Sequence, residues 1–290
     1  MPKILNPILT RLNLAFLAVL SACGSNHPSA PEVDTETATQ IAPSPTDATP
    51  QSDYAQNLES SLPLKTTWQI QYSGKMDYSL DVDMFNLDLF ETDAKTILAL
   101  KERGIFVMCY FSAGSHEDWR PDAQEFPAEA LGKPMQGWEG ETWLDIRSPS
   151  LRPIMESRLD LARAKGCDGV DPDNVNGYEN DTGFPLVYDD QIAFNIYLAN
   201  QAHERGLLIG LKNDLEQIPD LLPFFDWALN EECFAHKECR LLLPFVEAGK
   251  PVFIIEYDLT PGEFCLQALT MKFNALQKNY ELDAFRFPCG

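Results

Sequence analysis

Histidine is scarce in this chain, and basic residues are outnumbered two to one by acidic ones. Its 290 residues include 4 histidines, 22 Lys and Arg and 44 Asp and Glu, so the formal net charge is −22. Such a charge repels a phosphate backbone, which argues against nucleic acid as a partner. It favours a cationic ligand, because an acidic cleft concentrates positive charge, although solubility after export is an alternative reason for the same composition.

The motifs that hold metals, redox centres and nucleotide cofactors are also missing. The histidines show no metal-ligand spacing, no two cysteines form a CxxC pair, and no glycine-rich phosphate loop follows any expected strand. The sequence therefore predicts neither a metal nor a cofactor.

The apolar run near the N-terminus, residues 12–20, is too short to cross a bilayer as a helix. It follows Lys3 and Arg11 and precedes Leu20-Ser21-Ala22-Cys23, the order of basic, apolar and small residues found in secretory signals. The end of this segment is similar to a bacterial lipobox, in which the cysteine is lipidated and becomes the new N-terminus. Residues 1–22 are thus predicted to be a lipoprotein signal peptide and Cys23 the lipidation site, with plain secretion as the alternative.

An exported protein anchored to the cell membrane by lipid follows from this interpretation. Gly24 and Ser25 carry no acidic retention signal, which favours the outer membrane if the cell has two membranes. Residues 25–50 are rich in Ser, Thr, Ala and Pro and cannot bury enough apolar surface to offset the entropy of ordering. We therefore interpret residues 23–63 as a lipidated Cys with a flexible, disordered linker, and residues 64–290 as the catalytic domain.

Six further cysteines remain, an even number that permits disulfides in an exported chain. Cys233 and Cys239 are close in sequence, and Cys265 and Cys289 share the last structural unit, so these two pairs are expected to be bonded. Cys109 and Cys167 fall in expected core strands, where a buried thiol is an equally good explanation.

After residue 63 one pattern repeats: an apolar strand, a polar loop and an amphipathic helix that ends in Gly. Glycine just past a helix is a stop signal because it accepts the left-handed conformation. Strands are expected at 68–73, 82–89, 105–111, 167–171, 207–211, 225–230, 252–257 and 283–287. Eight alternating units predict an α/β fold, a (β/α)8 TIM barrel, with an open doubly wound sheet as the alternative. The long segment 115–148 contains three tryptophans and is expected to be a folded insertion near the barrel mouth.

Acidic residues follow several of these strands, at the barrel end where active sites of this architecture lie. Asp88, Asp173, Glu231 and Glu256 come from four different strands and would repel one another unless they were partnered, and Lys212 offers a partner. Stability alone would not favour such a cluster, which indicates a functional site. Aromatic residues near the same ends can stack on the apolar faces of sugar rings.

The residues from 64 onward resemble the endo-α-1,4-polygalactosaminidase family of glycoside hydrolases, which are (β/α)8 barrels. The matching stretches are 68–74, 109–114, 117–122, 140–146, 166–174, 210–214, 225–233 and 283–289. The resemblance implies hydrolysis of α-1,4-linked galactosamine polymers, with a retaining outcome expected. It places the catalytic acids on Asp173 and Glu231, and it suggests a supporting role for Asp171, where the family often has Glu.

On this hypothesis Asp173 is the nucleophile and Glu231 the acid/base, and sequence leaves the reverse order open. The residues expected to contact substrate or hold the acids are Asp88, Tyr110, Trp143, Asp171, Asn174, Lys212, Asn213, Glu256 and Tyr257. The expected partner is a cationic amino-sugar polysaccharide, bound by a monomer. A rival hypothesis is a non-catalytic surface lipoprotein that binds the same polymer. The sequence does not identify the natural polymer or its acetylation.

Overall fold

The computed structural model of this chain describes residues 61–290. The predicted signal peptide, Cys23 and all but the last three residues of the predicted linker lie outside this range. Within it, no helix is both long and apolar enough to cross a membrane.

Parallel strands form a curled sheet in which spatial order follows chain order, β1-β2-β3-β7-β8-β9-β10-β11. The strands are β1 (Trp68–Gln71), β2 (Met84–Asp88), β3 (Phe106–Ser112), β7 (Gly169–Asp173), β8 (Leu208–Lys212), β9 (Trp227–Glu231), β10 (Val252–Glu256) and β11 (Asn274–Gln277). A short last strand, β12 (Phe287–Pro288), pairs antiparallel with β11. The curled parallel sheet has the TIM-barrel-like architecture that the alternating pattern predicts.

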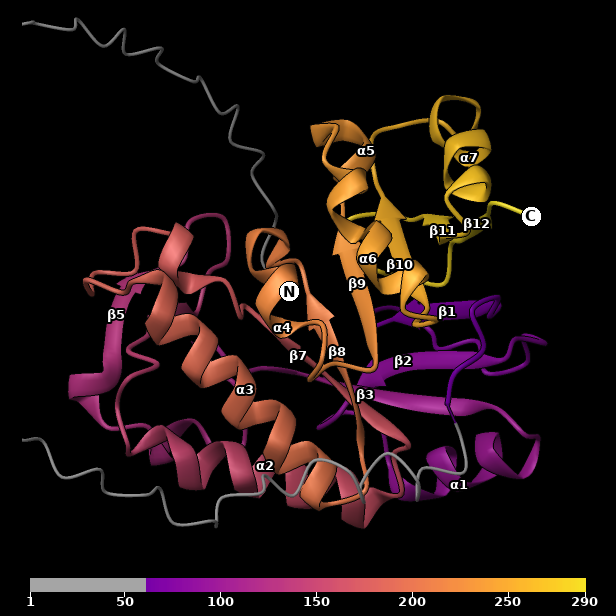
Figure 1. Cartoon of the computed structure of the whole chain (residues 1–290). Helices are drawn as coiled ribbons and strands as arrows, with labels where there is room; N and C mark the ends of the chain where they lie inside the picture. Colours follow the sequence, from indigo (N-terminus) through magenta and orange to yellow (C-terminus); the bar gives the residue numbers. More distant parts are fainter. Residues whose placement is uncertain (1–60) are drawn as a thin grey trace, which may run out of the picture. The chain divides into compact units, whose positions relative to one another are not determined.

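Helices connect most of these strands and lie outside the curled sheet (Figure 1). They are α1 (Ala94–Glu102), α2 (Leu151–Lys165), α3 (Tyr188–Glu204), α4 (Ile218–Leu221), α5 (Cys233–His236), α6 (Leu243–Glu247) and α7 (Pro261–Thr270). The predicted stop signal is present at the end of α2, where Gly166 adopts a left-handed φ of 90° and its N–H bonds to carbonyls of the last turn.

The strands bury both faces, and alternate side chains serve two separate cores. One core lies between sheet and helices and includes Phe85, Val170 and Ala228. The other lies inside the curl, where the Trp68 and Trp227 rings meet Phe253 at centroid distances of 4.9 and 5.6 Å. Because the side-chain period is two, the five- and seven-residue strands β2, β3, β7, β8 and β9, which start with an inward residue, also end with one.

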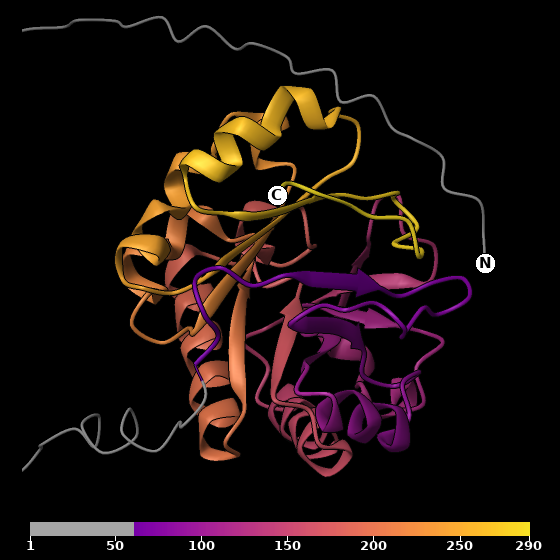
Figure 2. The same cartoon turned by 90° about the vertical axis from the view of Figure 1, so that its right-hand side faces the viewer.

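The first and last parallel strands meet without a backbone ladder between them. Instead Trp68 Nε1 donates to the Asn274 carbonyl at 2.9 Å, and Lys278 Nζ donates to Gln69 Oε1 at 3.2 Å. The C-terminal segment runs beside β1 (Figure 2) and its Leu282 carbonyl accepts from the Tyr72 N–H at 2.9 Å. Side chains and this segment therefore close a seam that backbone pairing leaves open.

The prediction that the eighth strand lies at 283–287 is wrong. The eighth parallel strand is β11, and only the end of the expected range, at β12, pairs with the sheet. The helix before β11, α7, is followed two residues later by Lys272, which has the left-handed conformation at φ 60°. Because this position is Lys and not Gly, the sequence carries no glycine stop signal at the end of α7. The pattern therefore does not predict β11, the strand that follows.

The insertion after β3 is folded, as expected. It forms an antiparallel sheet in the order β4-β6-β5, made of β4 (Ser115–Glu117), β5 (Leu131–Pro134) and β6 (Glu141–Leu144). Gly114 leads into it so closely that a Cβ there would lie 1.8 Å from the Asn174 carbonyl oxygen. The insertion is thereby held against the loop that follows β7.

Three disulfides cross-link the described residues. Cys233 is bonded to Cys239 and Cys265 to Cys289, the two pairings expected from the sequence. The third joins Cys109 to Cys167, which the sequence left open. Cys109 lies on β3 and Cys167 precedes β7, and these strands are neighbours in the sheet. The Cys265–Cys289 bond fixes the C-terminal segment to α7, next to the seam.

Candidate active site

Inward-facing side chains at the carboxyl ends of β7, β8, β9 and β10 converge on one point. They are Asp173, Lys212, Glu231 and, one residue beyond β10, Tyr257. Each lies an even number of residues after an inward residue of its own strand, such as Trp227 for Glu231 or Phe253 for Tyr257. The alternation of side chains along these strands therefore places four polar groups at the carboxyl end of the curled sheet, which we call the mouth.

Lys212 joins the two carboxylates. Its Nζ lies 3.0 Å from Asp173 Oδ1 and 3.1 Å from Glu231 Oε2, and its side chain is only 5% exposed. Burial opposes a charge on Lys212, but Asp173, Glu231 and Asp171 outweigh it and raise its pKa well above the ordinary value. A permanently charged lysine therefore allows two acids to share one small site.

Both oxygens of Glu231 are hydrogen-bonded. The Tyr257 hydroxyl donates to Oε1, while Lys212 and the Asn213 amide donate to Oε2, the latter at 3.4 Å. Burial would raise the pKa of Glu231, but Lys212 and Tyr257 together hold it below its ordinary value. Glu231 is therefore ionised at neutral pH in the free protein.

Asp173 is held on one oxygen only. Its Oδ1 accepts from Lys212 and from the Asn174 N–H at 2.8 Å. Among the described residues no donor is hydrogen-bonded to Oδ2, and the side chain is 18% exposed. One oxygen is thus fixed while the other remains available to a ligand in the mouth.

The chain turns sharply after each of these strands. Asn174, Asn213 and Glu232, which follow Asp173, Lys212 and Glu231, have φ values of 62°, 58° and 64°. Asn accepts the left-handed region readily, but for Glu232 it costs conformational energy. Such strain is tolerated where it orients a neighbouring functional group, here Glu231.

Asp171 lies one step below Asp173 in the lumen and is fully buried. Its Oδ2 accepts from Asn86 Nδ2 at 2.7 Å, and the Tyr72 hydroxyl donates to the Asn86 oxygen at 2.9 Å. Burial raises the pKa of Asp171 to about 6, although Lys212 opposes this. Its position suits a support for Asp173 rather than direct contact with a large ligand.

Asp88 is not free to bind an amine, contrary to expectation. Arg120 Nη2 lies 2.8 Å from Asp88 Oδ2, and the same guanidinium donates twice to Glu117. Arg120 comes from the insertion, whose position relative to β2 the sequence did not indicate. Asp88 thereby anchors the insertion to the barrel.

Glu256, which was also expected to contact substrate, faces away from the mouth. Glu256 is fully buried on the helix-facing side of β10, where it accepts from the Phe234 N–H at 2.7 Å. It precedes the inward-facing Tyr257 by one residue, so the pleat directs it outward. Trp143 lies in β6 of the insertion and is 9% exposed. Tyr110 stays in the lumen, with its ring centroid 4.5 Å from that of Tyr72.

Several residues near the site were not singled out from sequence. Asn86 and Ser112 lie on inward positions of β2 and β3, so strand periodicity could have found them. Tyr280 gave no such signal. Its ring stacks on Tyr257 at 4.2 Å, and its hydroxyl bonds to Glu232 and Asp258.

A cleft of about 230 Å³ opens beside Glu231 and is acidic. Its lining residues are Asn176, Glu179, Asn213, Asp214, Leu215, Glu216, Asn230, Glu231, Glu238 and Leu241. Among residues 61–290, no cationic side chain lines this cleft. Burial and Glu179 raise the pKa of Asp214 to about 8. Asp214 is therefore mainly protonated at neutral pH, and the glutamates that line the cleft are the groups that favour a positively charged ligand.

A profile of glycoside-hydrolase family GH114 matches residues 47–290. The chain belongs to this family. It is therefore a glycoside hydrolase, and the resemblance seen in the sequence is confirmed.

Solved structures agree with this family assignment. This chain is similar to Aspergillus fumigatus Ega3, whose crystal structure was solved in complex with galactosamine. The two sequences are 42% identical, and the structures superpose with a TM-score of 0.77 over 80% of this chain and 98% of that one. The glycoside hydrolase domain of PelA from Pseudomonas aeruginosa is 15% identical, with a TM-score of 0.61 over 76% of this chain and 97% of that domain, and it shares the fold. An uncharacterised protein of Deinococcus radiodurans is 26% identical over 86% of this chain and 89% of its own length.

The candidate site in this GH114 chain consists of a carboxylate pair bridged by a lysine, with an acidic cleft on one side. Carboxylate pairs are the usual machinery for glycosidic bond cleavage. Enzymatic hydrolysis thus accounts for the Asp173–Lys212–Glu231 cluster better than the non-catalytic alternative considered from the sequence.

Proposed function

We propose that this GH114 enzyme is an endo-α-1,4-polygalactosaminidase that cleaves deacetylated galactosamine polymer with retention of configuration. The observation that carries the proposal is the Lys212-bridged pair, Asp173 and Glu231, beside a cleft lined by acids and no bases. The 42% identity to Ega3, whose crystal structure contains galactosamine, supports an amino sugar as the substrate.

The spacing of the acids favours retention. Asp173 Oδ1 and Glu231 Oε2 both lie within 3.1 Å of the same nitrogen atom. These two oxygens are therefore closer together than the roughly 6.5 Å at which the inverting class begins, and the retaining class has a separation of about 5–5.5 Å.

Glu231 is ionised in the free protein, so it must first take up a proton from solvent. In the first step it gives this proton to the glycosidic oxygen as Asp173 Oδ2 attacks the anomeric carbon. The bond from that carbon to the leaving oxygen breaks, and a covalent glycosyl ester forms on Asp173. In the second step, Glu231, now ionised, takes a proton from water as the water oxygen attacks the same carbon. The ester bond breaks, and Asp173 is released as a carboxylate. Two inversions give net retention.

Recognition of the amino group rests on the acidic cleft. Glu179, Glu216 and Glu238 form no ion pair among the described residues, whereas Asp88 is already paired with Arg120. Free carboxylates attract the ammonium group of a deacetylated sugar, and an N-acetyl group would leave them without a cationic partner. We therefore assign amine selectivity to this cleft and not to Asp88 or Glu256.

Release of reducing ends from a panel of polysaccharides tests the proposed substrate. Partially deacetylated galactosaminogalactan is expected to be cleaved faster than its fully acetylated form and faster than chitosan, which differs in linkage and in the orientation of the 4-hydroxyl. Polymer binding without any release of reducing ends, or equal rates on all three, would refute the assignment.

Tyr257→Phe is expected to separate the roles of the two acids through the pH dependence of kcat/KM. The substitution removes a hydrogen bond that lowers the pKa of Glu231, so that pKa rises. If Glu231 is the acid, activity requires its protonated form, and the alkaline limb of the profile moves to higher pH. Movement of the acidic limb instead would identify Glu231 as the nucleophile and reverse the proposed order.

Export and lipid anchoring at Cys23 remain part of the proposal. The three disulfides between residues 109 and 289 support export, because disulfides persist in oxidising compartments. A Cys23→Ser chain should leave the membrane fraction and retain its specific activity. Its complete retention in membranes would contradict the lipid anchor.

A further inference from the structure

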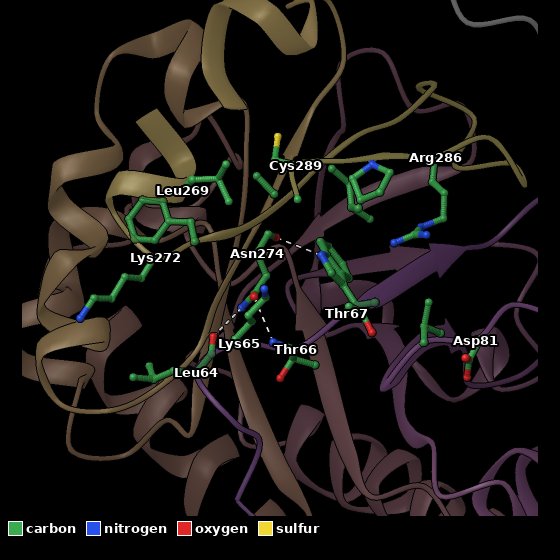
Figure 3. Close-up of a pocket in the computed structure, with 17 residues that line it drawn as sticks. Leu64, Lys65, Thr66, Thr67, Asp81, Leu269, Lys272, Asn274, Arg286 and Cys289 are labelled. Atoms are coloured by element: carbon green, nitrogen blue, oxygen red, sulfur yellow. Dashed lines mark hydrogen bonds between the residues drawn. The ribbon is translucent and has the colours of Figure 1, made fainter. Parts of the chain in front are cut away.

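A second pocket, of about 400 Å³, lies at the seam between β1 and β11. We call it the seam pocket. Its walls come from residues that begin these strands, such as Trp68 and Asn274, and from the C-terminal segment (Figure 3). The catalytic acids lie at the opposite, carboxyl ends of the parallel strands. The seam pocket is therefore separate from the active site.

The seam pocket is mainly apolar and open to solvent. Val82, Phe273 and Leu276 are buried in its wall, and Leu269 on α7 is 50% exposed beside it. Ligand sites typically have volumes of roughly 300–1,000 Å³, apolar walls and a few polar groups that fix orientation. The seam pocket meets the first two conditions.

Arg286 supplies the polar group. Its guanidinium extends into the pocket above Asp81 (Figure 3), its Nε is buried without a hydrogen-bond partner, and no carboxylate lies within 4 Å of it among the described residues. The other arginines that are buried or half-buried in the described part of the chain all have carboxylate partners. Arg120 pairs with Asp88 and Glu117, Arg158 with Asp122, and Arg205 with Asp160.

An unpaired, half-buried arginine is unexpected in a chain with twice as many acids as bases. Burial lowers the pKa of Arg286, and no neighbouring carboxylate opposes the effect. Burial lowers the pKa of the nearby Lys278 to about 7; Asp283 opposes this effect and Arg286 adds to it. Arg286 therefore has no ion-pair partner among the described residues.

We propose that the seam pocket binds a small amphipathic anion, a phosphate or carboxylate joined to an apolar chain. Arg286 pairs with the anionic group, and Leu269 and Phe273 contact the apolar chain. Lys65 and Lys272 at the pocket edge add positive charge. Asp81 and the C-terminal carboxylate of Gly290 also line the pocket, so affinity depends on Arg286 rather than on net charge alone.

Calorimetric titration of the full Cys23→Ser chain with decyl phosphate tests the proposal without any polysaccharide. One molecule is expected to bind per chain, and Arg286→Gln should weaken binding by about tenfold or more, since a hydrogen-bonded charge is lost. Arg163→Gln is the matched control, because Arg163 is an exposed arginine on α2, and it should leave affinity unchanged. Leu269→Trp, which fills the pocket, should also weaken binding.

Three further ligands define which part of the probe is recognised and where a ligand would come from. Inorganic phosphate and decanol should each bind much more weakly than decyl phosphate. Arg286-dependent binding to phosphatidylglycerol vesicles would identify membrane lipid as the source, and binding to decyl phosphate alone would identify a free ligand. Absence of saturable decyl phosphate binding, or binding unaffected by both Arg286→Gln and Leu269→Trp, would overturn the proposal.

Thermal unfolding provides a second measurement. Without ligand, Arg286→Gln should unfold at the same temperature as the parent chain or higher, because it removes an unpaired charge. Decyl phosphate should raise the unfolding temperature of the parent chain and not that of Arg286→Gln. A variant that unfolds at a clearly lower temperature in the absence of ligand would mean that Arg286 already has a partner, contrary to the proposal. Polygalactosaminidase activity is not a readout here, so this test and that of the proposed function fail independently.

Discussion

Asp173→Asn and Glu231→Gln are each expected to lower kcat by about 10³-fold or more, with folding preserved. Each substitution keeps the shape of the side chain and removes the group that attacks or transfers a proton, and general acid–base catalysis alone contributes roughly 10²–10⁴-fold. Reducing-end release on deacetylated galactosamine polymer measures the rate. Circular dichroism and thermal unfolding measure the fold.

Glu256→Gln is the matched control for this experiment. Glu256 is also a buried carboxylate next to the end of a barrel strand, but it faces the helices and accepts from the Phe234 N–H. Its substitution should leave kcat nearly unchanged. Asp171→Asn should cause an intermediate loss, because Asp171 contacts Asn86 below the mouth. Near-normal rates in Glu231→Gln, together with a dead Glu256→Gln enzyme, would refute the assigned roles.

Azide can assign the two roles independently of pH. With Asp173→Ala, azide replaces the missing nucleophile and should give a glycosyl azide of inverted configuration. With Glu231→Ala, azide attacks the covalent intermediate and should give the retained configuration. The opposite stereochemistry in the two variants would exchange the nucleophile and the acid/base.

Lys212→Met is expected to destabilise the protein by about 3–5 kcal/mol at neutral pH and to abolish activity. It removes the cation that lies 3.0 Å from Asp173 and 3.1 Å from Glu231, and it leaves buried carboxylates without compensation. Chemical denaturation measures the free energy of unfolding. The loss of activity follows because the two acids can no longer be held close together.

The pH dependence of this effect has a definite sign. Without Lys212 the folded-state pKa values of the nearby carboxylates rise above their unfolded values. The loss of unfolding free energy in Lys212→Met is therefore largest at a pH above the folded-state pKa values. It becomes smaller as the pH falls and the carboxylates become protonated. Lys101→Met is the matched control. The Lys101–Asp168 pair is more exposed, with side-chain exposures of 36% and 20%, and should contribute about 1 kcal/mol or less. A Lys212→Met loss no larger than this would mean that the bridge is not structurally important.

The sequence alone determined much of the fold. Alternating apolar runs and glycine-terminated helices give seven of the eight parallel strands, because local periodicity and stop signals are properties of neighbouring residues. Asp173, Lys212 and Glu231 could be selected for the same reason, since each ends an apolar strand. The sequence even suggested Lys212 as a partner for the acids.

Tertiary structure decided the points that depend on residues far apart in the chain. The pairing of Cys109 with Cys167 requires β3 and β7 to be neighbours, and the neutralisation of Asp88 requires the insertion to bring Arg120 onto β2. Strand β11 lacked a glycine signal and was recognised only by its pairing with β10.

The direction of each side chain was the other matter left to the folded structure. Glu256 and Tyr257 are adjacent in sequence, yet the pleat turns one toward the helices and the other toward Glu231. A strand-end residue can be found from composition, but its side depends on which residues of that strand fill the lumen. The seam pocket likewise exists only because the two ends of the sheet meet without backbone pairing. Local patterns thus determined which residues end the strands, and packing between distant segments determined what those residues contact.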